Sequence, residues 1–156
     1  MLYFVTLFVL SWTWFIGLAD KTKFRIFFPT CLLAMYLAST VDFYAHHYGL
    51  WNYPAPTDKQ TYWYHLSQQF GIYPIVVYFY LQWLPSNRNW KIMFKYIFLW
   101  TLLAIFLEWT AIRTGSMEHK KWWTFAHSYT SDWILYFIFY WNHKWWVRLK
   151  QPENTS

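Results

Sequence analysis

Four side chains that can transfer protons or bind a ligand lie within or beside apolar stretches of the chain: Asp42, His46, Glu108 and His127. Asp42 and His46 are four residues apart, which places them one turn apart on the same face of a helix. A carboxylate and an imidazole in this arrangement can act as acid and base, or supply two ligands to a metal ion. Glu108 has apolar neighbours on both sides, and a membrane accommodates such a carboxylate only when it faces the interior of a helix bundle. We therefore predict a catalytic site made of these four residues.

The same residues also have structural interpretations. Asp42 can form a hydrogen bond with a neighbouring helix, and His46 can lie in the layer of lipid headgroups. A single histidine in an apolar helix, such as His127, is more often a hydrogen-bonded core residue than a ligand. The donor atoms of the four residues suit zinc or manganese, but they come from separate segments without a compact spacing signature. The sequence therefore leaves a metal or other cofactor unknown, and it leaves open whether a reaction is catalysed.

The composition indicates the surroundings in which these residues must be placed. Of the 156 residues, 57% are hydrophobic and 28% aromatic, while only 13% are charged, against about 25% charged in soluble domains. We therefore predict an integral membrane protein in contact with a lipid bilayer. The single cysteine, Cys31, excludes an intramolecular disulfide and a thiolate metal cluster. The net charge of +6 comes from lysines and arginines dispersed between apolar runs, which argues against a nucleic-acid partner.

Five apolar runs approach the roughly 20 residues that a helix needs to cross a bilayer. They cover residues 2–18, 26–48, 65–84, 92–112 and 122–141. The third run contains Gly71 and Pro74, which predicts a kinked helix with its bend near residues 69–71. Residues 49–62, between the second and third runs, contain prolines and polar turn residues among aromatic ones, and we predict an ordered interfacial loop there.

The predicted fold is an all-α bundle of five transmembrane helices. The connections are too short for a second domain, so residues 1–150 are expected to form one domain and residues 151–156 a polar cytoplasmic tail. Nine lysines and arginines lie after the first and third runs and beyond the fifth, and four lie in the other two connections. Because the cytoplasmic side carries the excess, we predict a multi-pass protein of the plasma membrane with its amino terminus outside and its carboxyl terminus inside.

This topology predicts the depth of the polar side chains. Asp42 and Glu108 each lie sixteen residues along an outward-running helix, about 24 Å at ~1.5 Å per residue, so they share a level near the outer leaflet. His127 is expected at a similar depth. Asp132 lies about one turn deeper, near the middle of the membrane, where an unpaired charge costs at least ~2.5–3.5 kcal/mol. We therefore expect Asp132 to be paired, hydrated or protonated.

One order of residues resembles a family of small, uncharacterised multi-pass membrane proteins common in spore-forming bacteria. The order consists of Phe28-Pro29-Thr30, Asp42, Gly49-Leu50-Trp51-Asn52-Tyr53, Pro74, Leu84-Pro85, Glu108, Gly115, Trp122 and Ser128. The likeness covers about residues 28–143 and departs from the family at Glu118-His119, where the family tends to have an aromatic residue. It implies the fold and a bacterial membrane location, and it implies no activity.

A fainter likeness links the stretch from Gly49 to Tyr53, after the aspartate-bearing run, to the membrane subunits of lycopene cyclases, which also have a Gly-Leu-Trp-x-Tyr step. Those proteins place an acidic pair in the following helix to protonate a polyene. Residues 65–70 of this chain contain no carboxylate, which ranks cyclisation below the first resemblance.

The leading hypothesis from the sequence is an outward-facing polar pocket that acts on or binds a lipid headgroup or another interfacial small molecule. A second hypothesis is a non-enzymatic accessory subunit, whose polar residues form hydrogen bonds within a larger membrane complex. A third is proton or ion conduction through Asp132 and Glu108. The sequence favours the first because Asp42 and Glu108 share a depth.

Overall fold

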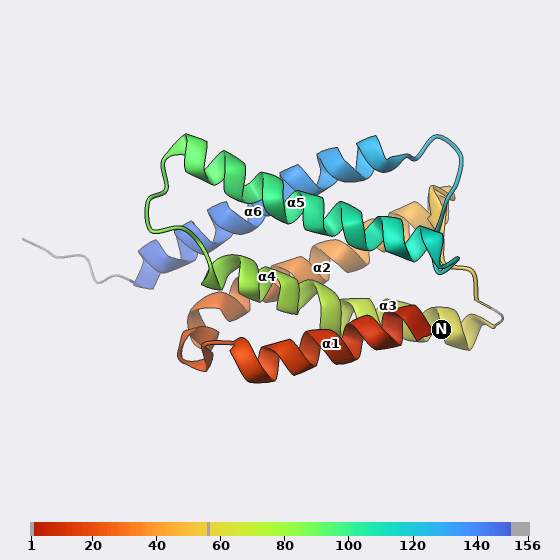
Figure 1. The fold of residues 1–156 in the computed structure, drawn as a ribbon, viewed down its shortest axis with the longest axis horizontal. Helices are drawn as coiled ribbons and strands as arrows, with labels where there is room; N and C mark the ends of the chain where they lie inside the picture. Colours follow the sequence, from red (N-terminus) through yellow and green to blue (C-terminus); the bar gives the residue numbers. More distant parts are fainter. Residues whose placement is uncertain (1, 56, 151–156) are drawn as a thin grey trace, which may run out of the picture.

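The computed structural model describes residues 2–55 and 57–150, and most of them are helical (Figure 1). The all-α class predicted from the apolar runs is therefore confirmed. The helices are α1 (Leu2–Leu18), η1 (Lys21–Lys23), α2 (Phe24–Tyr48), α3 (Asp58–Ser67), η2 (Gln68–Ile72), α4 (Tyr73–Gln82), α5 (Trp90–Arg113) and α6 (Phe125–Lys150).

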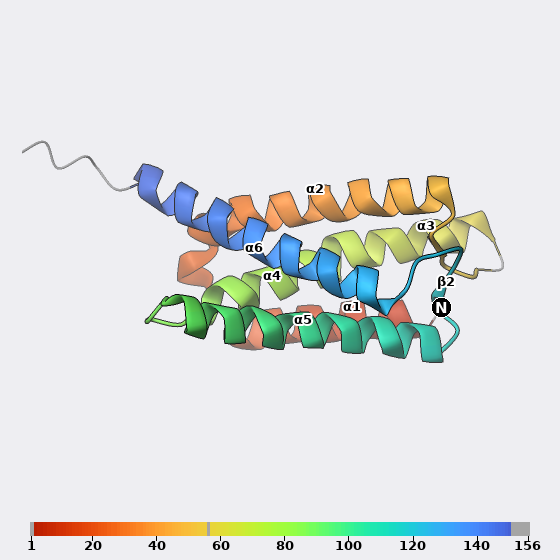
Figure 2. The same ribbon diagram turned by 90° about the horizontal axis from the view of Figure 1, so that it is seen from above.

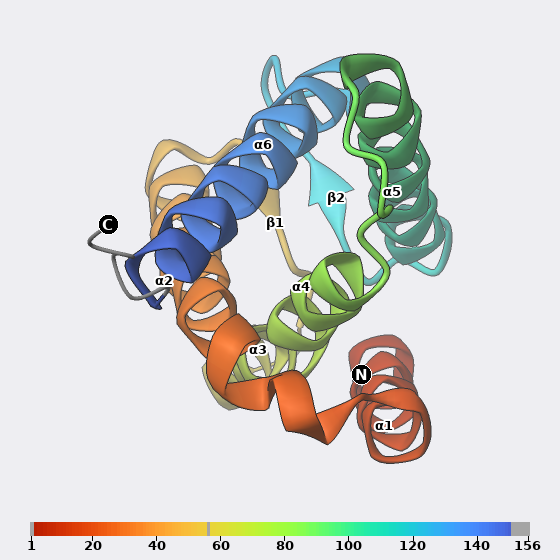
Figure 3. The same ribbon diagram turned by 90° about the vertical axis from the view of Figure 1, so that its left-hand side faces the viewer.

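The long helices run side by side along the long axis of the molecule (Figures 1 and 2). Contacts join α2 to α4 and α6, and α5 to α6, while α1 packs against α3, η2 and α4. Figure 3, which looks along the bundle, shows α1 on the outside of the ring formed by the other helices. The arrangement leaves the inner faces of α2, α4, α5 and α6 directed toward one another.

The largest differences from the helix boundaries expected from the apolar runs are at α3 and α6. Helix α3 begins at Asp58, inside the stretch expected to be a loop, because the Thr57 side chain accepts a hydrogen bond from the Gln60 amide at 3.3 Å and caps the helix. The last helix runs from Phe125 to Lys150, so it begins later and continues further than the apolar run at 122–141. Polar residues can extend a helix beyond its apolar part, because its backbone bonds do not depend on hydropathy.

The bend predicted near residues 69–71 falls in η2, a π-helical turn between α3 and α4. Pro74 lies in the first turn of α4 and has no amide hydrogen, so the regular backbone bond cannot form at this point. Gly71 lies directly against the ring of Phe8 in α1, and a Cβ atom added to Gly71 would be 2.3 Å from Phe8 Cδ2. The absence of a side chain at Gly71 therefore allows α1 to pack against η2.

A two-stranded ribbon, not expected from the sequence, joins the α2–α3 and α5–α6 connections. Strand β1 (Trp51–Asn52) pairs antiparallel with β2 (Glu118–His119), with Trp51 opposite His119 and Asn52 opposite Glu118. The Asn52 amide donates to Glu118 Oε1 at 3.1 Å, and Lys120 Nζ lies 2.8 Å from the same oxygen. The ribbon covers one end of the bundle (Figure 3).

The two ends of the bundle differ in charge. Figures 1 and 2 place the α1–α2 turn, the α4–α5 connection and the carboxyl-terminal end of α6 at the end opposite the ribbon. These are the three basic segments counted in the sequence, so the folded chain brings them together at one end.

Two helical segments in the described chain are long and apolar enough to cross a membrane, Lys21–Tyr48 and Trp90–Arg113, and the apolar α1 is shorter. Of the five predicted crossings, these two meet that criterion. In their most apolar windows, only 28% and 22% of the residues are buried inside the protein. Most of their apolar surface therefore faces outward.

Candidate functional site

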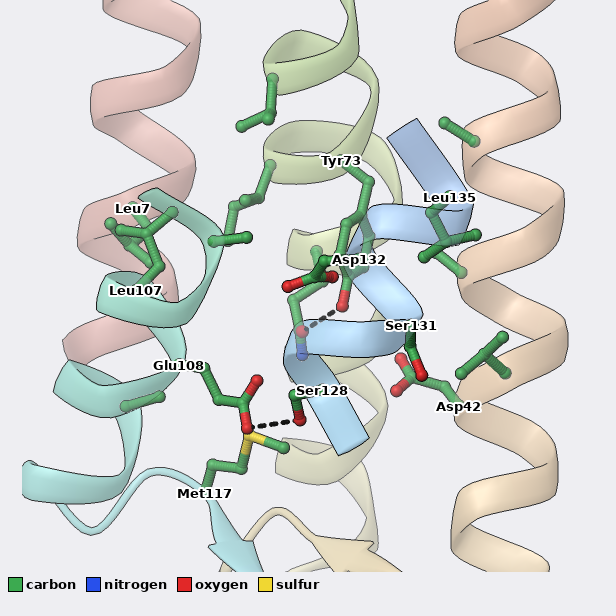
Figure 4. Close-up of a pocket in the computed structure, with 18 of the residues that line it drawn as sticks. Leu7, Asp42, Tyr73, Leu107, Glu108, Met117, Ser128, Ser131, Asp132 and Leu135 are labelled. Atoms are coloured by element: carbon green, nitrogen blue, oxygen red, sulfur yellow. Dashed lines mark hydrogen bonds between the residues drawn. The ribbon is translucent and has the colours of Figure 1, made fainter. Parts of the chain in front are cut away.

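A cavity of about 220 Å³ lies inside the bundle beneath the ribbon (Figure 4). Its walls come from α1, α2, η2, α4, α5 and α6, and its lining residues include three carboxylates but no lysine, arginine or histidine. Its volume is many times the ~10–15 Å³ that a single water molecule requires. The lining residues with polar atoms in their side chains are Tyr3, Asp42, Trp51, Tyr53, Gln68, Tyr73, Glu108, Trp123, Ser128, Ser131, Asp132 and Tyr136.

The cavity is polar toward the ribbon and apolar toward the opposite end. Leu103 and Ala104 of α5 and Leu135 and Phe139 of α6 line the apolar part. Alanines on α2 and α5 leave room there, because their side chains end at Cβ; among them is Ala38. An apolar pocket with a few convergent polar groups is the usual form of a small-molecule site.

Asp42 is buried at the polar end, and protein groups occupy both of its carboxylate oxygens. Trp51 Nε1 and the Tyr53 hydroxyl donate to Oδ1 at 3.3 and 3.1 Å, and His65 Nδ1 lies 3.4 Å from Oδ2. Trp51 and Tyr53 come from the segment that leaves α2, and His65 comes from α3. Asp42 therefore connects the ribbon to two helices.

The hydroxyl of Tyr53 also lies 3.4 Å from Gln68 Oε1, an atom that accepts a second hydrogen bond from the Tyr73 hydroxyl at 3.0 Å. Burial raises the pKa of Tyr53 well above its ordinary value, and the nearby charge of Asp42 raises it further. Tyr53 therefore keeps its proton and acts as a donor to one of the two acceptors at a time. Gln68 is placed in the cavity by the π-helical turn.

Glu108 is held by a second set of partners. Its Oε1 lies 2.5 Å from His119 Nε2, in β2, and accepts a hydrogen bond from Ser128 Oγ at 2.7 Å. Trp123 Nε1 in turn donates to Ser128 Oγ at 2.9 Å. Both bonds of Glu108 use Oε1, so Oε2 has no hydrogen-bond partner in the described part of the chain.

Asp132 lacks such partners. It lines the cavity from α6, near Tyr73 of α4 (Figure 4), and it makes no hydrogen bond or ion pair with any described residue. Its electrostatic neighbour is the like-charged Glu108. Of the three carboxylates, Asp132 is therefore the one with both oxygens available to a ligand.

The structure brings together two of the four residues predicted as a site. Asp42 and Glu108 both line the cavity, whereas His46 is exposed on α2 and His127 is exposed near the start of α6. The buried residues Ala34 and Ala45 lie on one side of Asp42 around α2, so Asp42 is at the edge of the buried face and the further advance of about 40° to His46 carries it to the exposed side. His127 Nδ1 instead accepts a hydrogen bond from the Thr124 amide at 3.2 Å. The prediction that all four side chains converge on one site is therefore corrected: Asp42 and Glu108 line the cavity, and His46 and His127 do not.

Two histidines outside the predicted site contact its carboxylates. His65 is three residues before Gln68, a spacing that puts both on one helix face, and this periodicity is a signal for their shared site. His119 lies in a connection, where no periodic pattern indicates its direction. Ribbon pairing brings it beside Glu108.

The geometry also bears on metal binding. In the described residues, no group of three or more His, Cys, Asp or Glu side chains is placed to hold a metal ion. No family model, curated protein or solved structure matches the chain. What the cavity can do therefore follows from its residues.

Proposed function

We propose that this chain is a multi-pass plasma-membrane protein that binds a small molecule from the membrane interface in the cavity beneath the ribbon. The observation that carries the proposal is the cavity itself, which has apolar walls and polar side chains gathered at one end. Its five long helical units would cross the bilayer, with the ribbon outside and the basic end in the cytoplasm, in keeping with the excess of positive charge on that side.

Support for a membrane location comes from the outer surface. Large apolar side chains on α1, α2, α5 and α6 are exposed around the bundle, among them Ile16, Phe43, Phe106 and Ile134. A soluble protein rarely exposes so extensive an apolar surface. Lipid would remove this surface from water, and the buried carboxylates would then face the cavity and avoid the hydrocarbon.

Binding is favoured over catalysis by the hydrogen bonds of the carboxylates. Asp42 and one oxygen of Glu108 are already engaged by donors of the protein, which suits fixed walls of a pocket. A general acid or base must reach the proton that it transfers, and Asp132 with the free oxygen of Glu108 are the groups placed to contact a ligand. The ligand would enter from the lipid–water interface near the ribbon.

A membrane-extraction experiment tests the location. When the protein is produced in bacterial cells, we expect it to remain in the membrane pellet after alkaline carbonate washing, because hydrocarbon holds an integral bundle regardless of pH. Release into the supernatant would contradict the membrane assignment.

Native mass spectrometry from mild detergent tests the cavity. Ala38→Phe fills the cavity, and Ala126→Phe adds the same side chain at an exposed site of α6 as the control. We expect the wild-type protein and Ala126→Phe to retain a bound small molecule that Ala38→Phe lacks. If all three proteins carry the same additional bound mass, or none, the cavity holds no ligand.

A further inference from the structure

The charge balance of the cavity identifies the chemical class of its ligand, on the basis that the cavity is the binding site proposed above. Its lining contains Asp42, Glu108 and Asp132 and no basic side chain. His65 and His119 approach the first two carboxylates and do not line the cavity. A ligand therefore meets acidic groups without any cationic side chain.

An anionic ligand does not fit these surroundings. Carboxylates and phosphates are bound in proteins by arginine, lysine or backbone amides at a helix terminus, and the lining offers none of the basic side chains. A ligand carboxylate would also face Asp132 and Glu108 at close range, where like charges repel strongly in a medium of low dielectric constant.

A metal ion fits less well than an organic cation. No three metal-binding side chains of the described residues are grouped closely enough to coordinate an ion. Much of the cavity wall is also apolar, with residues such as Leu103, Leu135 and Phe139. These residues supply no ligand atoms to a metal, but they can pack against the carbon atoms of an organic molecule.

A protonated amine matches the groups that lack partners. An ammonium group donates three hydrogen bonds and accepts none. Both oxygens of Asp132 and Oε2 of Glu108 are acceptors without protein donors, and the Ser128 hydroxyl lies beside Glu108 in this part of the cavity (Figure 4). Tyr73 and Trp123, whose rings are of the kinds that attract cations, also line the cavity.

We propose that the cavity binds an amphipathic primary amine, with its ammonium group at Asp132 and its hydrocarbon part between α5 and α6. The ammonium ion supplies the counter-charge that Asp132 lacks within the protein, and the apolar end takes the hydrocarbon. Asp42 holds Trp51 of the ribbon and His65 in the last turn of α3, and it does not contact the ammonium group.

The test compares three probes of equal chain length in detergent at neutral pH: n-hexylamine, n-hexanol and hexanoate. An alkyl amine with a pKa near that of lysine, about 10.4, is protonated under these conditions. Binding is measured by calorimetry on the full-length protein. We expect hexylamine to bind at least about tenfold more tightly than hexanol, the size of one charge-assisted hydrogen bond, and hexanoate to show no binding.

Two variants and a control assign the preference to Asp132. Asp132→Asn is expected to lower hexylamine affinity about tenfold and to leave hexanol unchanged, because only the charge is removed. Asp20→Asn, at the opposite end of the bundle, changes the net charge equally and is expected to alter neither. Ala38→Phe is expected to abolish binding of both probes. The wild-type comparison needs no variant, so it stands even when a substituted protein fails to fold.

The possible failures are distinguishable. If hexylamine and hexanol bind the wild-type protein equally and neither binds Ala38→Phe, the cavity is a binding site but the amine assignment is wrong. Tighter binding of hexanoate would overturn it as well. Absence of binding by all three probes, or binding that Ala38→Phe leaves intact, would contradict both the amine assignment and the cavity as the site of function.

Discussion

Gly71 in the π-helical turn and Phe8 in α1 are in direct contact, with the Phe8 ring in the space that a Cβ atom at residue 71 would occupy. This contact holds α1 against the irregular part of the bundle. Because Tyr3, Phe4 and Leu7 of α1 line the cavity, the fit between two residues outside the polar cluster sets one wall of the candidate site.

Gly71→Ala is predicted to lower the stability of the protein by about 1–3 kcal/mol, the usual cost of overpacking a fitted interior. Gly17→Ala is the matched control, since a Cβ at Gly17 meets nothing within 4 Å and alanine favours a helix by roughly 0.5–1 kcal/mol. Thermal unfolding in detergent measures both. Adding Phe8→Ala to Gly71→Ala removes the clash, and the double variant should lose less stability than the two single changes summed. Strict additivity would show that the contact does not limit the packing of α1.

Replacing Asp42 by alanine is predicted to lower the stability of the protein, whereas replacing Asp132 is not. Asp42→Ala leaves the Trp51 Nε1 group without its acceptor and leaves the Tyr53 hydroxyl only the longer bond to Gln68 Oε1, at a cost of about 1–3 kcal/mol. Asp132→Ala leaves no donor unpaired and removes a like charge from Glu108, so the ligand-free protein is expected to keep or gain stability. The unfolding temperatures of the two variants, measured in the same detergent, provide the comparison. Equal losses would mean that Asp132 has a structural partner after all.

The ribbon is predicted to loosen in acid. The Lys120 ammonium and the Asn52 amide, both bonded to Glu118, lower the pKa of that carboxyl below its ordinary value of 4.5. Because this pKa is lowered in the folded state, the bonds of the Glu118 carboxylate to Lys120 and Asn52 contribute fully to ribbon stability above about pH 4.5. That contribution is lost as the pH falls through the lowered pKa. Amide hydrogen exchange at residues 118–120 is expected to accelerate below that range, after correction for intrinsic exchange.

Glu118→Gln provides the control for the acid response. The glutamine has no carboxyl group to protonate, so the pH dependence of ribbon exchange should become flatter than in the wild-type protein. An unchanged acid response in this variant would assign the effect to another group.

Labelling of single cysteines tests the predicted orientation of the bundle in the membrane. The native thiol of Cys31 is buried, and replacing it by alanine provides the background. Lys59→Cys lies near the ribbon and Ser86→Cys in the α4–α5 connection, and both positions are exposed. We expect a membrane-impermeant maleimide to label Lys59→Cys and not Ser86→Cys in intact cells. The reverse pattern would place the cavity entrance at the cytoplasmic side.

Two kinds of sequence pattern predicted helices correctly: continuous apolar runs, and residues whose backbone properties break a helix. Apolar runs predicted α1, α2 and α5 because hydrocarbon and bundle contacts select continuous apolar length. The break at η2 followed from Gly71 and Pro74, whose backbone properties are independent of context. The start of α3 was missed because one capping contact of Thr57 decides it among residues that favour turns. The ribbon was missed because two-residue strands have no detectable period.

The sequence by itself determined that Asp42 and Glu108 are carboxylates embedded in apolar helices, and this restricts them to the interior of a bundle. Only the tertiary structure decided their partners. His65 and His119, and not His46 and His127, meet these carboxylates, because helix rotation and the path of the connections depend on packing between segments far apart in the chain. Such packing is a property of the whole bundle, and neighbouring residues in the sequence do not encode it locally.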